Sequence, residues 1–170
     1  MKIAYKCARF FAYIIEILIV YILEQTPNLI FEIYGVRPTI LVLVAVMIAL
    51  FEGHTVGAVF GFFIGLLFDV GAAGNMGFYS IAITCLGFLV GNIAQKIIKF
   101  NLITSVAIAS VFVFAFYAVH FLFEFLFCGY VDRLYSLVNH YLIAALYTAA
   151  LAPFIYFFTK GFAVNIKYED

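Results

Sequence analysis

The chain has 170 residues, of which 68% are hydrophobic and only 11% are charged, and its mean hydropathy is +1.19. Because soluble domains carry about 25% charged residues, this composition excludes an ordinary soluble domain and predicts an integral membrane protein. The 9 basic and 9 acidic residues balance to a formal net charge of zero, which gives no indication of nucleic-acid binding.

The chain opens with basic residues and then an apolar run, as a secretory signal peptide does. The run extends to about 20 residues and no small-residue cleavage site follows it, so we expect a retained first transmembrane helix. Further apolar segments predict an all-α bundle of six transmembrane helices, in a single polytopic membrane domain over residues 1–170. The expected helices cover residues 10–24, 39–51, 55–70, 78–94, 102–127 and 141–158.

The distribution of basic residues supports this count and places both termini in the cytoplasm. Seven of the nine basic residues then lie on the inner side, which is the bias expected of a membrane protein. Only Arg37 and Arg133 lie outside. A five-helix arrangement would move Lys160 and Lys167 outside and weaken the bias.

The second and third segments are short, and a polar turn, Glu52-Gly53-His54, joins them. At about 1.5 Å per residue they span only about 20–24 Å. We therefore expect a short glycine-rich central hairpin, formed by the second and third helices and shielded by longer ones. Either the turn lies below the membrane surface or the membrane thins there, and polar backbone at that depth requires cover by protein.

Glycine recurs at every fourth position through the third segment, and a shorter repeat lies in the fourth segment. Small residues at this spacing let transmembrane helices approach closely. The repeats indicate either packing within the chain or a docking groove for another protein's transmembrane helix. The glycines concerned are Gly53, Gly57, Gly61, Gly65, Gly87 and Gly91.

Two carboxylates fall inside expected helices, where an unpaired charge is costly. Asp69 either has a cavity or a partner such as Arg37, or it faces interfacial water or caps the fourth helix. Glu16 either draws the Arg9 side chain toward it or is protonated, and an intramembrane carboxylate is a functional candidate by default.

The remaining polar candidates lie in the central turn and on the fifth helix. Glu52 and His54 are either solvated or capping groups of the turn, or a contact point for a cytoplasmic partner. His120 and Glu124 share one helix face because they are four residues apart. They form either a hydrogen-bonded pair near the outer surface or part of a metal site, although no recognised ligand motif is present.

No residue pattern in the chain indicates catalysis. The cysteines lack the spacing of a disulfide framework or a zinc site, and no nucleophile elbow, phosphate-binding loop or metalloprotease motif appears. We therefore expect no enzyme activity, no metal and no cofactor. The cysteines are Cys7, Cys85 and Cys128.

Residues 36–77 resemble the rod shape-determining protein MreD family. The resemblance lies in V-R-P, an apolar helix, E-G, then G-A-V-F-G-F-F-I-G-L-L-F-D and, after a loop of small residues, a further glycine. Order and spacing match together, whereas Glu16 and His54 depart from the family pattern. The matching residues are Arg37, Pro38, Glu52, Gly53, Gly57, Gly61, Gly65, Asp69 and Gly77.

The resemblance implies a non-enzymatic inner-membrane component of the bacterial cell-elongation machinery. Proteins of this family are thought to bind MreC, a partner with one membrane helix and an outer domain. They also associate with the actin-like MreB filament, with the wall synthase RodA and with a class B penicillin-binding protein. The implied role is a membrane scaffold, in contact with lipid, that helps to organise peptidoglycan synthesis and cell shape.

A protein of another class would fit the same size and helix number. The substrate-binding subunit of an energy-coupling-factor vitamin transporter needs polar groups around a small ligand. Asp69, Arg37, Asn75, His120 and Glu124 could supply such groups on the outer side. An intramembrane enzyme using His120 and Glu124 is a third interpretation.

Overall fold

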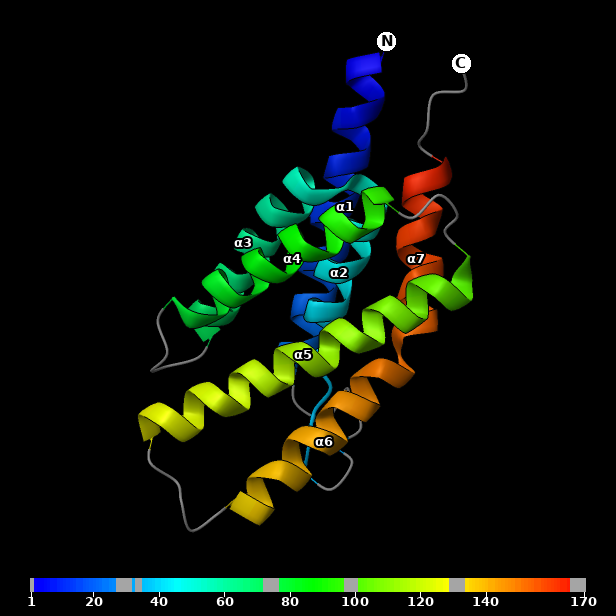
Figure 1. The fold of residues 1–170 in the computed structure, drawn as a ribbon. Helices are drawn as coiled ribbons and strands as arrows, with labels where there is room; N and C mark the ends of the chain where they lie inside the picture. The colour runs from blue at the N-terminus through cyan, green and yellow to red at the C-terminus, as the bar shows by residue number, and fades with distance from the viewer. Residues whose placement is uncertain are drawn as a thin grey trace.

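The computed structural model describes residues 2–26, 32, 35–71, 77–96, 101–128 and 134–165, and their side chains over 7–26, 32, 35–71, 77–96, 101–123 and 140–163. Within these ranges the chain forms helices packed into one bundle (Figure 1). This confirms the all-helical prediction. The helices are α1 (Lys2–Gln25), α2 (Ile40–Glu52), α3 (His54–Gly71), α4 (Phe78–Lys96), α5 (Leu102–Cys128), α6 (Leu134–Ala150) and α7 (Ala152–Asn165).

Several helices are long and apolar enough to cross a membrane. In the described part of the chain these are α3, α4 and α5, and the bent pair α6–α7 makes a fourth candidate span. The shorter helix α2 is apolar as well. The helices thus support a membrane protein, whereas six crossings with both termini in the cytoplasm stay a prediction. Figure 1 places the first turn of α1 and the last turn of α7 at the same end of the molecule.

The predicted single helix over residues 141–158 is wrong, because the chain bends there by 44° between α6 and α7. Pro153 is the physical reason. A proline has no backbone N–H to donate to the preceding turn, and its ring crowds that turn. The Leu151 N–H instead donates to Thr148 O at 3.1 Å, and Phe154 N–H restarts the next helix by donating to Leu151 O at 3.1 Å.

Helix α2 forms the centre of the bundle. Every residue from Leu41 to Leu50 is buried, and α2 packs against each of the other helices that the structure describes. A helix that is apolar on all sides is suited to such a position. Helix α3, in contrast, makes its most extensive contact with α4 rather than with α2. The closely packed glycine-rich pair is therefore α3–α4, which differs from the expected hairpin of α2 and α3.

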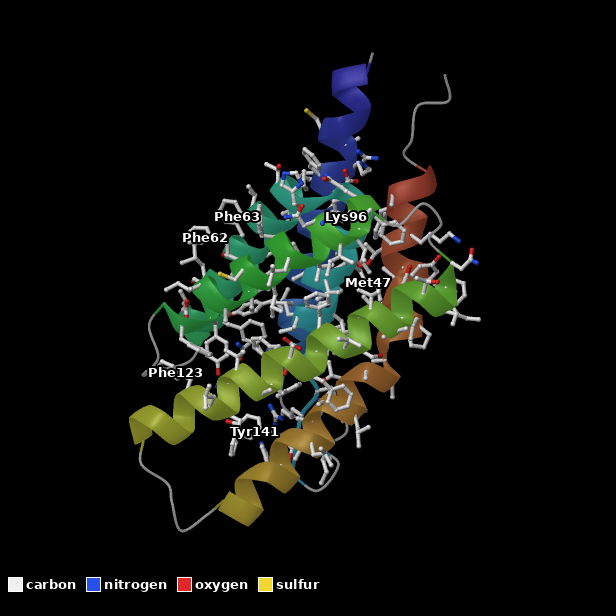
Figure 2. The ribbon with its side chains drawn as sticks, in the orientation of Figure 1. Met47, Phe62, Phe63, Lys96, Phe123 and Tyr141 are labelled. Atoms are coloured by element: carbon white, nitrogen blue, oxygen red, sulfur yellow. The ribbon has the colours of Figure 1, made fainter. Side chains whose placement is uncertain are left out.

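The outer surface of the bundle carries many large apolar side chains. Figure 2 shows Met47 inside the bundle, whereas Phe62 and Phe63 point away from it on α3. The exposed fractions of these two phenylalanines are 46% and 57%, compared with 0% for Met47. Large exposed apolar surfaces mark contact with lipid or with another protein, which agrees with a position in a membrane.

Candidate functional site

The glycines of α3 lie where this helix meets its neighbours. A Cβ atom built on Gly57 would lie 2.5 Å from Ala49 Cβ and 2.8 Å from the Gly87 carbonyl oxygen. One built on Gly61 would lie 2.7 Å from the Ile83 carbonyl oxygen. Since real Cβ contacts are longer, a side chain at either position would push the helix backbones apart.

The remaining glycines of the two repeats also lie where α3, α4 and the α2–α3 turn meet. A Cβ atom on Gly65 would meet the backbone of Ser80, and one on Gly91 would meet the backbone of His54. Gly53, between α2 and α3, has φ of +89°, a backbone conformation that favours glycine. The faces that the glycines create are thus occupied by this chain's own helices.

A partly buried ion pair joins α1 to the end of α2, next to the turn between α2 and α3. Arg9 Nη2 donates to Glu52 Oε2 at 2.9 Å, and Arg9 Nε lies 2.8 Å from Glu52 Oε1. The Tyr13 hydroxyl donates to Glu52 Oε1 at 2.9 Å. This corrects the suggested approach of Arg9 to Glu16. The side chain of Glu52 is only 7% exposed, so it is a structural anion rather than a solvated turn residue.

Asp69 caps the N-terminus of α4. Its carboxylate accepts hydrogen bonds from Tyr79 N–H at 3.2 Å, from Ser80 N–H at 3.0 Å and from the Ser80 hydroxyl. A helix N-terminus favours a carboxylate because its first N–H groups lack intrahelical partners. The suggested pair with Arg37 is wrong, because the exposed Arg37 side chain instead contacts Glu32 at 2.6 Å.

Replacing Asp69 with alanine should therefore destabilise the joint between α3 and α4. Loss of a capping side chain costs about 1–2 kcal/mol, and the freed donors are buried or partly buried. The measurement is thermal unfolding of the purified protein in detergent. Ser110→Ala is the matched control, because Ser110 donates only to Val106 O in its own helix. Equal melting temperatures for the two variants would show that the cap contributes nothing.

A polar cluster near the start of α2 was not predicted from the sequence. The Tyr117 hydroxyl lies 2.5 Å from Thr39 Oγ1 and 3.2 Å from Thr148 Oγ1, so it links α5 to α6 and to the residue preceding α2. Glu24 Oε1 accepts a hydrogen bond from Leu41 N–H at 3.1 Å. The sequence shows these polar residues at the ends of apolar segments. It does not show which of them pair, because the pairing depends on which helices are neighbours.

The candidate polar groups of the outer side do not converge on one ligand. His120 Nε2 lies 2.9 Å from the Tyr79 hydroxyl, and its ring packs against Phe116 and Tyr141. The side chain of Glu124 and the whole of Asn75 lie outside the described residues. Among the described side chains, no group of three metal-ligating residues is present. His54 in the central turn packs edge-on against Phe88 at 5.5 Å.

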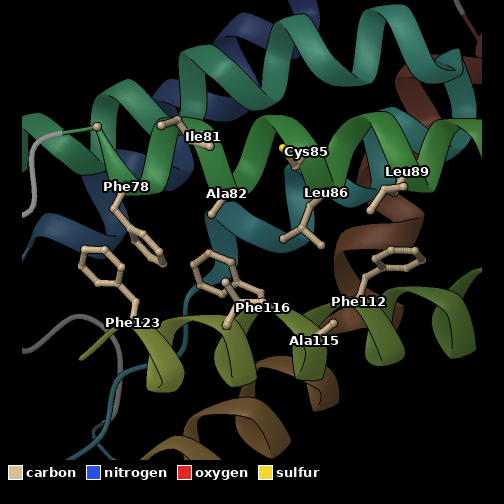
Figure 3. Close-up of a pocket in the computed structure, with 12 residues that line it drawn as sticks. Phe78, Ile81, Ala82, Cys85, Leu86, Leu89, Phe112, Ala115, Phe116 and Phe123 are labelled. Atoms are coloured by element: carbon tan, nitrogen blue, oxygen red, sulfur yellow. The ribbon is translucent and has the colours of Figure 1, made fainter. Parts of the chain in front are cut away.

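Apolar grooves open on the outer surface of the bundle, two of similar volume and a smaller one between α5 and α6. One, with a volume of about 700 Å³, lies between α4 and α5 (Figure 3). Its walls include the small residues Gly77, Ala82, Cys85 and Ala115. Phe78 on α4 and Phe123 on α5 stack across it, with ring centroids 4.1 Å apart.

The second groove, of about 690 Å³, lies between α1 and α3. Its walls carry larger side chains, among them Phe10, Phe60 and Phe63. Small residues on α1 occur elsewhere, at Ala4, Ala8 and Ala12, so the first helix does carry an A-x-x-x-A repeat. Figure 1 shows that the first turns of α1 project beyond the other helices. The α4–α5 groove therefore combines small residues on both walls with a volume of about 700 Å³, whereas the α5–α6 groove, which carries Ala118 and Ala145, has a volume of only about 180 Å³.

Comparison with known proteins identifies a family. The family model described as rod shape-determining protein MreD matches residues 5–162. Neither the curated proteins nor the solved structures gave a match. Since the match spans nearly the whole chain and extends the resemblance of residues 36–77 across the described helices α1 to α7, the chain belongs to the MreD family of rod shape-determining proteins.

Proposed function

We propose that this chain is a non-enzymatic, multi-pass component of the bacterial inner membrane that serves the cell-elongation complex. In this role it binds an MreC-like protein through that partner's single transmembrane helix and helps to organise peptidoglycan synthesis. MreB, RodA and a class B penicillin-binding protein are the further partners that family membership suggests. Support comes from the family and from a chain made almost wholly of apolar helices.

The contacts of the glycines indicate which surface of the bundle is free to bind a partner. Their close approaches are to Ala49, to α4 and to the α2–α3 turn, so we assign the glycine repeats to packing within the chain. A partner helix then requires another surface where backbones can approach closely. The α4–α5 groove offers this at Ala82 and Ala115, one from each wall. Transmembrane helices associate through such small residues because lipid supplies no hydrophobic drive.

A bulky residue in the α4–α5 groove should block the partner while leaving the fold intact. Ala115→Trp is the variant, because Ala115 is an exposed residue of the groove wall. We expect recovery of the MreC-like partner to fall about tenfold, which corresponds to ~1.4 kcal/mol. The measurement is affinity purification of the tagged protein from its native membrane after mild crosslinking, followed by quantitative mass spectrometry.

The matched control is Val59→Trp, which places the same side chain in the α1–α3 groove at a residue that is 51% exposed. Partner recovery should stay unchanged for this variant, and both variants should accumulate to the wild-type level. Equal losses in the two variants would contradict the assignment to the α4–α5 groove. Recovery of transporter ATPases with a coupling membrane subunit would contradict the scaffold function itself.

A further inference from the structure

A carboxyl group is buried where α1 meets α7. The exposed fraction of Glu16 is 2%, and that of Thr159 on α7 is 0%. The Thr159 hydroxyl donates to Glu16 Oε1 at 2.7 Å, which joins residues 143 positions apart in the chain. The second carboxyl oxygen, Oε2, is also buried and has no hydrogen-bond partner among the described atoms.

The charged and titratable groups that α1 and α2 bring to this joint are engaged with one another. Arg9, two helical turns before Glu16, pairs with Glu52. The hydroxyl of Tyr13 donates to Glu52 as well. Helix α2, which packs against both α1 and α7, is apolar from Ile40 to Phe51, and Glu52 is its single ionisable residue.

Helix α7 also provides no cation that pairs with Glu16 among its described residues. Lys160 follows Thr159 in the chain, but it is exposed, and its Nζ lies 5.3 Å from the centroid of the Tyr156 ring. Within the described part of the chain, the hydroxyl of Thr159 is thus the polar group that the structure pairs with Glu16. Thr159 is a neutral hydrogen-bond donor, so it does not compensate a negative charge.

Burial without a cation strongly disfavours the ionised form of a carboxyl group, because no nearby charge replaces the lost hydration. A neutral carboxylic acid accepts the same bond from Thr159 and leaves one weak donor unpaired, which is far less costly. We propose that Glu16 is a proton-binding site of the α1–α7 joint, whose carboxylate takes up one proton from water as the two helices pack together.

The proposal makes the joint sensitive to pH. The packed state binds one more proton than an unfolded state in which the carboxyl of Glu16 meets water. Linkage then requires the stability of the joint to fall as pH rises above the ordinary carboxyl range near about pH 4. This sensitivity does not depend on the proposed partner.

The direct test uses the wild-type protein and dicyclohexylcarbodiimide, an apolar reagent. The O–H group of a protonated carboxyl adds across a C=N bond of this reagent, whereas a carboxylate does not. Labelling in detergent, followed by peptide mass spectrometry, should place the adduct on Glu16. Labelling should fall about tenfold for each pH unit once the group titrates. Absence of an adduct on Glu16 across about pH 5 to about pH 9 would overturn the proposal.

A second measurement tests the stability of the joint. In Glu16→Gln the amide is a neutral mimic of the protonated carboxyl, so its melting temperature should vary less with pH than that of the wild type. Glu32→Gln is the matched control, because Glu32 is an exposed carboxylate paired with Arg37 and should keep the wild-type pH profile. Identical pH profiles for Glu16→Gln and the wild type would contradict the proposal. If Glu16→Gln does not fold, the labelling result decides.

Discussion

Replacing Gly65 with leucine is expected to prevent the protein from folding. The first side-chain atom at this position would meet the backbone of Ser80 and the carbonyl oxygen of Tyr79, 2.6 Å away. Backbone atoms cannot turn aside as the end of a flexible side chain can, so α3 and α4 would have to separate. Overpacking of this kind costs about 1–3 kcal/mol for modest insertions, and a leucine at a helix crossing exceeds that. The measurement is the amount of monodisperse protein extracted from membranes.

The control for this substitution is another helical glycine. Gly161 lies in α7, and a Cβ atom there would meet nothing within 4 Å. Gly161→Leu should accumulate to the wild-type level, because leucine is a good helix former in an open position. Wild-type levels and partner recovery in Gly65→Leu would mean that the close approach of α3 and α4 is not required.

Breaking the ion pair between Arg9 and Glu52 is expected to destabilise the bundle by about 3 kcal/mol. Arg9→Ala removes the cation and leaves a carboxylate whose side chain is 7% exposed. Removal of one partner from a buried pair is costly because the other charge stays desolvated. Chemical or thermal unfolding in detergent measures the loss, and the double variant Arg9→Gln with Glu52→Gln should recover part of it.

The exposed ion pair of the same chain provides the control. Arg37 and Glu32 are 46% and 45% exposed in their side chains, and such surface pairs contribute only about 0–1 kcal/mol. Arg37→Ala should therefore melt close to the wild type. If Arg9→Ala and Arg37→Ala shift the melting temperature equally, burial of the Arg9–Glu52 pair does not govern its contribution.

Much of the fold could be predicted from apolar runs and their punctuation. The predicted helix over residues 39–51 differs from α2 by a single residue at each end, because Pro38 precedes it and Gly53 follows it. The bend before Pro153 was missed because the hydrophobic composition continues through it. The family could be predicted from the order and spacing of glycines and polar residues within residues 36–77.

The pairing of polar side chains could not be predicted to the same degree. Arg9 and Glu52 are 43 residues apart, and Thr159 and Glu16 are 143 apart. Such contacts depend on which helices are neighbours and on their rotation, and hydrophobic runs specify neither. The role of Asp69 was easier to predict from the sequence, because the backbone N–H groups that it caps lie only 10 and 11 residues later in the chain.

The most direct test of the scaffold account is site-specific photocrosslinking in native membranes. A photoreactive amino acid would replace Leu89, which lines the α4–α5 groove and is 52% exposed, and in separate variants Leu18 of the α1–α3 groove and Ala8 of α1. The account predicts an adduct with the transmembrane segment of an MreC-like protein at Leu89 and none at Leu18 or Ala8. An adduct with that segment at Leu18 or Ala8, without one at Leu89, would contradict the proposed binding surface.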